Sequence, residues 1–367
     1  MNENQIYVIY GDHIKEMTAS LLEAVDLKGR IPSHDSLIGL KPNLVVAKPS
    51  STGATTTPEI VEGVIEYLQK NGFHNLLILE GSWVGDDTGR AFKVCGYDRI
   101  SRQYGVPLFD TKKDSVSVQS YGGISMEICK KALETDFLID LPVLKGHCQT
   151  YVTGALKNMK GCISDREKRH FHTLGLHRPI AYLNKLLRPD FVVADGICGD
   201  LDFEEGGNPV RMNRIFACSD PVLTDSYIAS CMGYRPSDIE YIRIAADIGV
   251  GSCDIDHADI IELNRDTTLA SPTSSRRVQG LAQYAEAKDA CSACYANLIQ
   301  ALARMEDCGE LRALKGHPVK IGQKYQNSSG SGPGVGRCAA GYKPCCMGCP
   351  PKTEEILKML RARGWRE

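Results

Sequence analysis

Long hydrophobic runs are missing from the sequence: no apolar segment in its 367 residues approaches the roughly 20 that span a bilayer. The N-terminal residues, Met1 to Gln5, have neither the basic segment nor the apolar core of a secretory signal. The sequence also has no large excess of positive or negative charge: its 43 Lys and Arg residues and 45 Asp and Glu residues give a net charge of -2. We therefore expect a cytoplasmic protein that binds neither nucleic acid nor a membrane.

Several common functional motifs are absent as well. No Gly-x-Gly-x-x-Gly follows a strand pattern, and the sequence has no P-loop, no Gly-x-Ser-x-Gly elbow and no His-Glu-x-x-His. Dinucleotide binding of the Rossmann type, P-loop nucleotide hydrolysis and esterase chemistry therefore lose support.

Strand and helix patterns alternate along the first 265 residues. Thr57 and Pro58 are expected to cap and open one helix, and a second helix is expected around Ala91 to Tyr104. The apolar, strand-like runs are 5–10, 75–79, 106–109, 136–141 and 191–194. This alternation predicts an α/β fold with a mostly parallel sheet and helices on both faces.

The composition changes after residue 265. Residues 266–282 are rich in Ser, Thr and Pro and predict a surface loop or linker, whereas 284–305 are Ala-rich and predict a helix. Residues 327–334 are too rich in Gly and Ser for regular structure, and Thr353 is expected to cap a final helix. The predicted organisation is an α/β domain, 1–265, and a smaller cysteine-rich region, 266–367.

The sequence contains 15 cysteines, a large number for a reducing compartment that disfavours disulfides. Eight are scattered singly and are interpreted as packing residues: Cys95, Cys129, Cys148, Cys162, Cys198, Cys218, Cys231 and Cys253. The other seven fall after residue 290: Cys291, Cys294, Cys308, Cys338, Cys345, Cys346 and Cys349. Metal or redox chemistry is therefore expected in the C-terminal region.

A four-ligand metal site can be assembled from these C-terminal thiols. The Cys-x-x-Cys spacing at 291–294 directs two sulfurs to one side of a helix or turn, and a Cys followed by Pro is typical of iron–sulfur proteins. The predicted cofactor is a [4Fe–4S] cluster, with structural zinc or plain thiols as alternatives. Its expected ligands are Cys291, Cys294, Cys338 and Cys349, with Cys345 and Cys346 competing for the last two places and Cys308 assigned to packing.

A second polar group lies in the α/β region. Lys145, His147, Lys157 and Asn158 predict an anion or metal site; the alternative is a solvated basic helix face beside a structural His147. Ligands bind beyond the carboxyl ends of parallel strands. The strand-end residues expected to converge there are Lys41, Asn43, Glu80, Lys145, His147 and Asp195.

Other polar residues are given structural roles. The acidic, Gly-rich run from Asp195 to Gly207 is expected to form an exposed loop, and Asp220 and Asp225 to cap a helix start. The histidines at 170, 172 and 177 are expected to sit on a loop without a metal.

Several motifs resemble the domain-of-unknown-function 362 family over about residues 37 to 250. They are Lys-Pro-Asn-Leu at 41–44, Thr-Thr-Thr-Pro-Glu at 55–59, Leu-Pro-Val-Leu-Lys-Gly-His at 141–147 and Lys-Asn-Met-Lys-Gly at 157–161. The resemblance implies an attached iron–sulfur cysteine motif, although no ferredoxin-type cysteine run occurs here. The Lys-x-His and Gly-x-x-Lys-Asn patterns are also similar to the nickel-dependent lactate racemase group, which implies Lys and His in a cleft between α/β domains.

Three functions remain open. The leading hypothesis is an iron–sulfur redox protein, and if an enzyme an iron–sulfur oxidoreductase, that exchanges electrons with a partner protein or a small-molecule substrate. The second is a metal- or cofactor-dependent isomerase or lyase acting at Lys145 and His147, with a structural metal in the C-terminal region. The third is a non-catalytic binding or assembly module.

Overall fold

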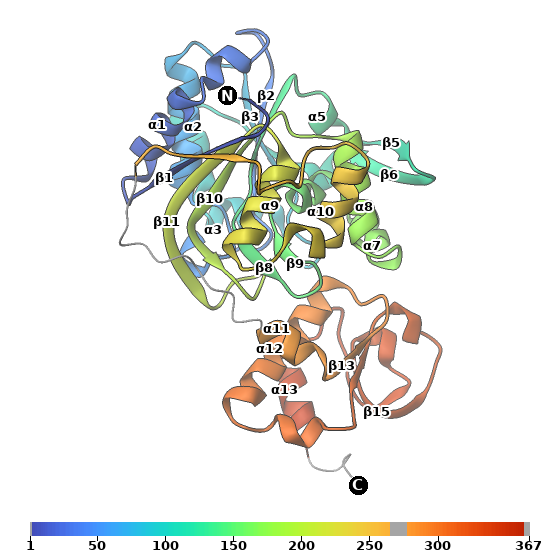
Figure 1. Cartoon of the computed structure of the whole chain (residues 1–367). Helices are drawn as coiled ribbons and strands as arrows, with labels where there is room; N and C mark the ends of the chain where they lie inside the picture. Colours follow the sequence, from blue (N-terminus) through green and yellow to red (C-terminus); the bar gives the residue numbers. More distant parts are fainter. Residues whose placement is uncertain (1, 265–276, 363–367) are drawn as a thin grey trace. The chain divides into compact units, whose positions relative to one another are not determined.

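The computed structural model describes residues 2–264 and 277–362, apart from a few side chains (Figure 1). Contacts divide the chain into two units. The α/β unit comprises residues up to Lys168 and from His177 to 264, and the C-terminal unit comprises Arg169–Leu176 and 277–362. The predicted linker at 266–282 lies largely outside the described residues; its last part is a helix, α11 (Arg277–Ala282), and not a loop.

Within the described residues, the α/β unit is built on an eight-stranded sheet in the order β12-β1-β11-β10-β7-β2-β3-β4. All neighbours are parallel except β11, which runs antiparallel to β1 and β10. The predicted mostly parallel α/β sheet is therefore confirmed. Its strands are β1 (Gln5–Tyr10), β2 (Ile38–Pro42), β3 (Leu76–Glu80), β4 (Leu108–Asp110), β7 (Phe137–Leu141), β10 (Phe191–Asp200), β11 (Pro209–Cys218) and β12 (Asp259–Glu262).

Helices cover both faces of this sheet (Figure 1). Side chains alternate between the two faces along a strand. Ile215 and Ala217 of β11 join the main apolar core with α1 to α4, whereas Phe216 between them packs edge-on against Tyr227 of α9. The helices are α1 (Ile14–Ala24), α2 (Pro58–Lys70), α3 (Thr88–Val94), α4 (Tyr97–Tyr104), α5 (Lys130–Leu133), α6 (Ala155–Asn158), α7 (Asp165–Thr173), α8 (His177–Leu186), α9 (Pro221–Cys231) and α10 (Glu240–Asp247).

Two antiparallel hairpins complete the unit, β5 (Val116–Tyr121) with β6 (Ile124–Cys129) and β8 (Lys145–His147) with β9 (Tyr151–Thr153). The helix predicted across Ala91 to Tyr104 is broken into α3 and α4. The break falls at Gly96, whose φ of 82° is left-handed and ends the first helix.

The C-terminal unit has a parallel four-stranded sheet in the order β13-β14-β15-β16. Its strands are β13 (Ala285–Ala287), β14 (Val319–Ile321), β15 (Gly330–Val335) and β16 (Tyr342–Cys346). Its longer helices are α12 (Ser292–Asp307) and α13 (Thr353–Arg361). Thr353 is the first residue of α13, and its N-cap position is taken by Lys352.

Two predictions for this unit are wrong. The Gly- and Ser-rich run at 327–334 forms most of β15, because its small residues let the neighbouring backbone approach: a Cβ on Gly334 would lie 2.7 Å from the Ala339 carbonyl oxygen. The Ala-rich run at 284–305 is not one helix, because its first part pairs with β14 as β13. In both segments tertiary pairing overrides local propensity.

Candidate functional site

Polar side chains meet at the carboxyl ends of the parallel strands, as expected. Lys41 in β2 and Glu80 at the end of β3 are buried, and Lys41 Nζ lies 2.8 Å from Glu80 Oε2. Lys41 Nζ also donates to the Pro42 carbonyl oxygen at 2.8 Å. This pair neutralises two buried charges next to the residues predicted to form the site.

Asn158, at the end of α6, joins these strand ends. Its Nδ2 group donates to the Lys41 carbonyl oxygen at 3.1 Å and to Asp140 Oδ1 at 2.6 Å. Its Oδ1 atom accepts from Asn43 Nδ2 at 2.9 Å and from Lys41 Nζ at 3.4 Å. Since an amide side chain has two donors and two lone pairs, Asn158 is fully engaged and acts as a structural junction.

Lys145, on β8, is also fully engaged. Its ammonium group donates to Asn43 Oδ1 at 3.0 Å, to the Glu204 carbonyl oxygen at 2.9 Å and to the Ala54 carbonyl oxygen. Complete burial lowers the pKa of Lys145 to about 8. Because an ammonium group has three donors, Lys145 ties three segments together and has no N–H left for a ligand.

His147, two residues further along β8, is held in one tautomer. Its Nδ1 atom accepts the backbone N–H groups of Gln149 at 3.1 Å and Thr150 at 3.0 Å, so the proton of the neutral ring is on Nε2. Nε2 lies 3.1 Å from Glu204 Oε2, off the direction of an ideal hydrogen bond. Burial and the nearby Lys157 charge lower the pKa of His147 to about 4. A protonated Nε2 has no lone pair in the ring plane to offer to a metal ion.

Glu204 lies between His147 and Lys157, whose ammonium group contacts Glu204 Oε1. Burial raises the pKa of Glu204, but the charge of Lys157 and the contact with His147 outweigh this and hold it well below its usual value. The neighbouring Glu205 behaves in the opposite way: burial and the Glu204 charge raise its pKa to about 7. The pKa values of two adjacent carboxyl groups are thus shifted in opposite directions.

The expectation that Asp195 to Gly207 forms an exposed loop is wrong. β10 continues to Asp200 with every residue buried, and Asp200 then accepts the backbone N–H groups of Asp202, Phe203 and Asn208. This folds the acidic run inward and buries Glu204. Glu204 was therefore missed, although the rule that ligands bind beyond strand ends, applied to β10, could have located it.

The aspartates assigned to capping do cap helices. Asp220 accepts the N–H groups of Val222 and Leu223 at the start of α9. Asp225 lies within α9 and accepts the N–H groups of Ala155 and Leu156, the first residues of α6. Asp225 thereby fixes the short helix that carries Lys157 and Asn158.

Asp195 accepts the Thr57 N–H at 2.7 Å, whereas the expected cap from the Thr57 side chain is absent.

The three histidines do not lie on a loop. His170 and His172 are in α7, in the part of the chain that groups with the C-terminal unit, and His177 begins α8. His177 stacks on Tyr241 with ring centroids 6.1 Å apart, and burial lowers its pKa.

In the C-terminal unit, backbone pairing brings Cys338 and Cys349 together. The parallel ladder between β15 and β16 continues beyond the strands: the Gly336 N–H donates to the Cys346 carbonyl oxygen at 2.9 Å, and the Arg337 N–H donates to that of Gly348 at 3.0 Å. The residues that follow these two bonds are Cys338 and Cys349.

The first cysteine pair is positioned by α12. Cys291 is the N-cap residue and Cys294 lies in the first turn. Gly336 passes close to this turn, because a Cβ placed on it would lie 3.7 Å from Cys294 Sγ. The helix start and the β15–β16 ladder therefore meet.

We call Cys291, Cys294, Cys338 and Cys349 the four-cysteine group. Burial and the other three thiols raise the pKa of Cys294 to about 12. Burial, Cys338 and Cys349 likewise raise the pKa of Cys291, which the Arg169 charge opposes. These mutual effects agree with the backbone contacts that bring the four thiols into one part of the unit.

The competing thiols have different surroundings. Cys345 Sγ lies 3.7 Å from the Gly336 carbonyl oxygen and 3.8 Å from Met347 Sδ, while Cys346 is buried. Cys308 is exposed beside Arg361, so its assignment to packing is wrong. Six of the eight scattered cysteines are buried, as expected for packing residues.

Within the described residues, no group of three or more His, Cys, Asp and Glu side chains is arranged to hold a metal ion. The four-cysteine group is thus a set of neighbours at electrostatic range. Its donor chemistry, four soft thiols, suits zinc or an iron–sulfur cluster.

None of the helices in the described part of the chain is long and apolar enough to cross a membrane.

The protein is of the α/β class. Its mostly parallel sheet carries a buried site of lysines and carboxylates at its strand ends, and a thiol-rich unit follows. The chain belongs to the family described as domain of unknown function DUF362, whose model matches residues 38–230. This confirms the family that the sequence motifs predicted.

Similar proteins include one relative from a cyanobacterium and two solved structures. A thylakoid-associated protein of Synechocystis sp. is 24% identical over 247 residues, which are 63% of this chain and 74% of that protein. The lactate racemase apoprotein of Thermoanaerobacterium thermosaccharolyticum is 14% identical with a TM-score of 0.38, over 60% of this chain and 56% of the other. A protein from Thermotoga maritima is 13% identical with a TM-score of 0.40, over 65% and 60%. The chain thus spans less than two thirds of these two structures.

Proposed function

We propose that the protein is an iron–sulfur redox protein whose [4Fe–4S] cluster is held by the four-cysteine group. The observation that carries the proposal is that two pairs of thiols, distant in the sequence, come together in one folded unit: the Arg337 N–H next to Cys338 donates to the Gly348 carbonyl oxygen next to Cys349, and Gly336 lies against Cys294. A bound cluster would supply one-electron transfer, to or from a protein partner or a small molecule. The high content of unpaired thiols favours the reducing cytoplasm.

The surroundings of the four-cysteine group suit an anionic cluster. Cys291 and Cys294 lie at the N-terminus of the 16-residue helix α12, where unpaired backbone N–H groups stabilise negative charge. Asn297, also in α12, donates to the Pro351 carbonyl oxygen at 2.8 Å. This bond fixes the segment that follows Cys349 to the helix that carries the other two thiols.

The competing occupant is one zinc ion, which four thiolates bind tetrahedrally. Anaerobic purification followed by a visible absorption spectrum before and after dithionite separates the two. We expect broad brown absorbance that bleaches on reduction, since thiolate-ligated iron is redox-active and zinc is not. A colourless, fully folded protein overturns the proposal.

Single replacements by serine test the ligand set. Replacement of any member of the four-cysteine group should abolish or strongly reduce the absorbance. Cys345→Ser and Cys346→Ser are the matched controls from the same segment and should retain it. Loss of the absorbance in these controls alone would assign the last two ligand places to Cys345 and Cys346.

A second candidate function, proton transfer in an isomerase or lyase, is favoured by the pair Glu204 and Glu205. Glu204 lies between a neutral His147 and the Lys157 ammonium group, next to Glu205 with its pKa near 7. Glu205 is the base of this pair: its raised pKa suits it to remove a proton from a substrate carbon and return it, whereas the lowered pKa of Glu204 makes that carboxylate a weak base. In this function Lys145 holds the site together, because its donors are already used.

Solvent exchange tests the second candidate. A panel of small carboxylates and carbonyl compounds is incubated with the protein in D2O, and deuterium at carbon is followed by NMR. Exchange that Glu205→Gln abolishes and Cys291→Ser preserves would support it. Exchange no faster than in protein-free solution would count against it.

A further inference from the structure

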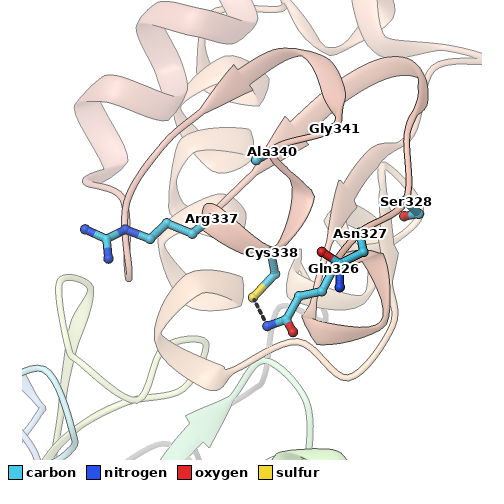
Figure 2. A pocket seen from close by; sticks show the side chains of 7 residues that line it. All are labelled: Gln326, Asn327, Ser328, Arg337, Cys338, Ala340 and Gly341. Atoms are coloured by element: carbon cyan, nitrogen blue, oxygen red, sulfur yellow. Dashed lines mark hydrogen bonds between the residues drawn. The ribbon is translucent and has the colours of Figure 1, made fainter.

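Two glutamines donate hydrogen bonds to sulfurs of the four-cysteine group. Gln323 Nε2 lies 3.6 Å from Cys291 Sγ, and Gln326 Nε2 lies 3.3 Å from Cys338 Sγ; Figure 2 shows the second bond as a dashed line. Each pair of thiols thus has one of its sulfurs bonded to a side-chain amide. Both glutamines come from one short segment that starts with the 3-10 turn Gln323–Tyr325.

This segment is anchored, so the two amide groups are held in place. The Gln323 N–H donates to the Asp289 carbonyl oxygen at 3.0 Å, and Gly322 before it has a left-handed φ of 125° with no room for a side chain against Lys288. The Tyr325 ring is buried and packs edge-on against Tyr342, with centroids 5.2 Å apart. The backbone positions from which the two amide groups reach the sulfurs are therefore fixed.

We infer that Gln323 and Gln326 are positioning residues that raise the reduction potential of the cluster held by the four-cysteine group. This inference rests on the proposed function. Reduction adds one electron and makes the cluster and its thiolates more negative. An N–H donor on a ligand sulfur stabilises the more negative state and so raises the potential.

A pocket beside Cys338 makes the two positions unequal. It has a volume of about 320 Å3, and Gln326, Asn327, Ser328, Arg337 and Cys338 are among the residues that line it (Figure 2). A water molecule occupies roughly 30 Å3 of liquid, so water can replace a shortened side chain at 326. Gln323 is half-buried whereas Gln326 is exposed, and electrostatic effects are stronger where water is excluded. Gln323 should therefore have the larger effect.

The test compares midpoint potentials of the full-length holoprotein, measured by redox titration with EPR detection. We expect Gln323→Leu and Gln326→Leu each to disfavour reduction at least threefold, a fall of about 28 mV for a one-electron couple. The midpoint potential should fall less in Gln326→Ala than in Gln326→Leu, because water enters the pocket and takes the place of the shortened side chain. Gln103→Leu, in α4 of the other unit, is the control and should leave the potential unchanged.

Iron and sulfide contents keep the outcomes distinct. A wild-type protein without a cluster refutes the proposed function and this inference with it. Full cluster content with unchanged potentials in both leucine variants overturns the inference alone.

Gln323→Glu covers the case in which the leucine variant loses its cluster. A protonated carboxyl can donate to the sulfur and an ionised one cannot, so the potential of this variant should fall more steeply with rising pH than that of the wild type. A parallel pH dependence would overturn the role of Gln323.

Discussion

His147 Nε2 lies 3.1 Å from Glu204 Oε2, while Nδ1 of the same ring accepts two backbone N–H groups. The ring is thereby fixed as a neutral donor, and a second proton would have to be placed on Nδ1 against those two N–H groups. Burial, followed by the nearby Lys157 charge, lowers the pKa of His147 to about 4.

The first prediction concerns acid stability. Unfolded, His147 takes up a proton near pH 6.5, but folded it does so only near pH 4. The contribution of neutral His147 to the free energy of unfolding is therefore complete above pH 6.5. It is lost as the pH falls toward 4, by about 3 kcal/mol in all. Urea unfolding followed by circular dichroism at pH 7 and pH 4.5 should show this loss in the wild type and a much smaller one in His147→Asn.

His13→Asn is the control for this prediction. His13 belongs to the same unit but is exposed, at the N-cap position of α1. This variant should lose as much stability on acidification as the wild type. Equal losses in His147→Asn and the wild type would show that His147 is protonated in the folded protein.

The second prediction concerns Lys145. Replacement by Met leaves three buried oxygen acceptors without their donor, those of Asn43, Ala54 and Glu204. We expect the free energy of unfolding to fall by about 3 kcal/mol. Lys93→Met, at an exposed position of α3, should change it by less than about 0.5 kcal/mol. A similarly small change at Lys145 would contradict its role as the tie between three segments.

The third prediction concerns the backbone before Cys349. Gly348 has a φ of 156°, and a Cβ there would lie 2.4 Å from Pro351 Cα. Gly348→Ala should displace the Cys349 segment and lower iron content severalfold. Gly332→Ala is the matched control, because Gly332 also has a positive φ, 97°, but open space around its Cα. Equal iron content in both variants would mean that the tight fit at Gly348 does not position Cys349.

Strand periodicity and the rule for strand ends were sufficient to predict the sheet and the meeting of Lys41, Asn43, Glu80 and Lys145. These depend on local patterns and on the geometry common to parallel sheets. Which donors are already used could not be predicted. The saturation of Lys145 and Asn158 depends on carbonyl groups from segments distant in the sequence.

Glu204 and the C-terminal unit show the same limit. An acidic, Gly-rich run is typical of an exposed loop, and only the three N–H groups that Asp200 accepts turn this one inward. Similarly, no local pattern indicates that Arg169–Leu176 groups with the C-terminal unit, or that Gln323 and Gln326 reach the sulfurs of the four-cysteine group. These contacts follow from tertiary folding.

The most direct test of the account is the iron, acid-labile sulfide and zinc content of anaerobically purified protein. We expect about four irons and about four sulfides per chain, falling to background when all members of the four-cysteine group are replaced by serine. One zinc per chain without sulfide would contradict it.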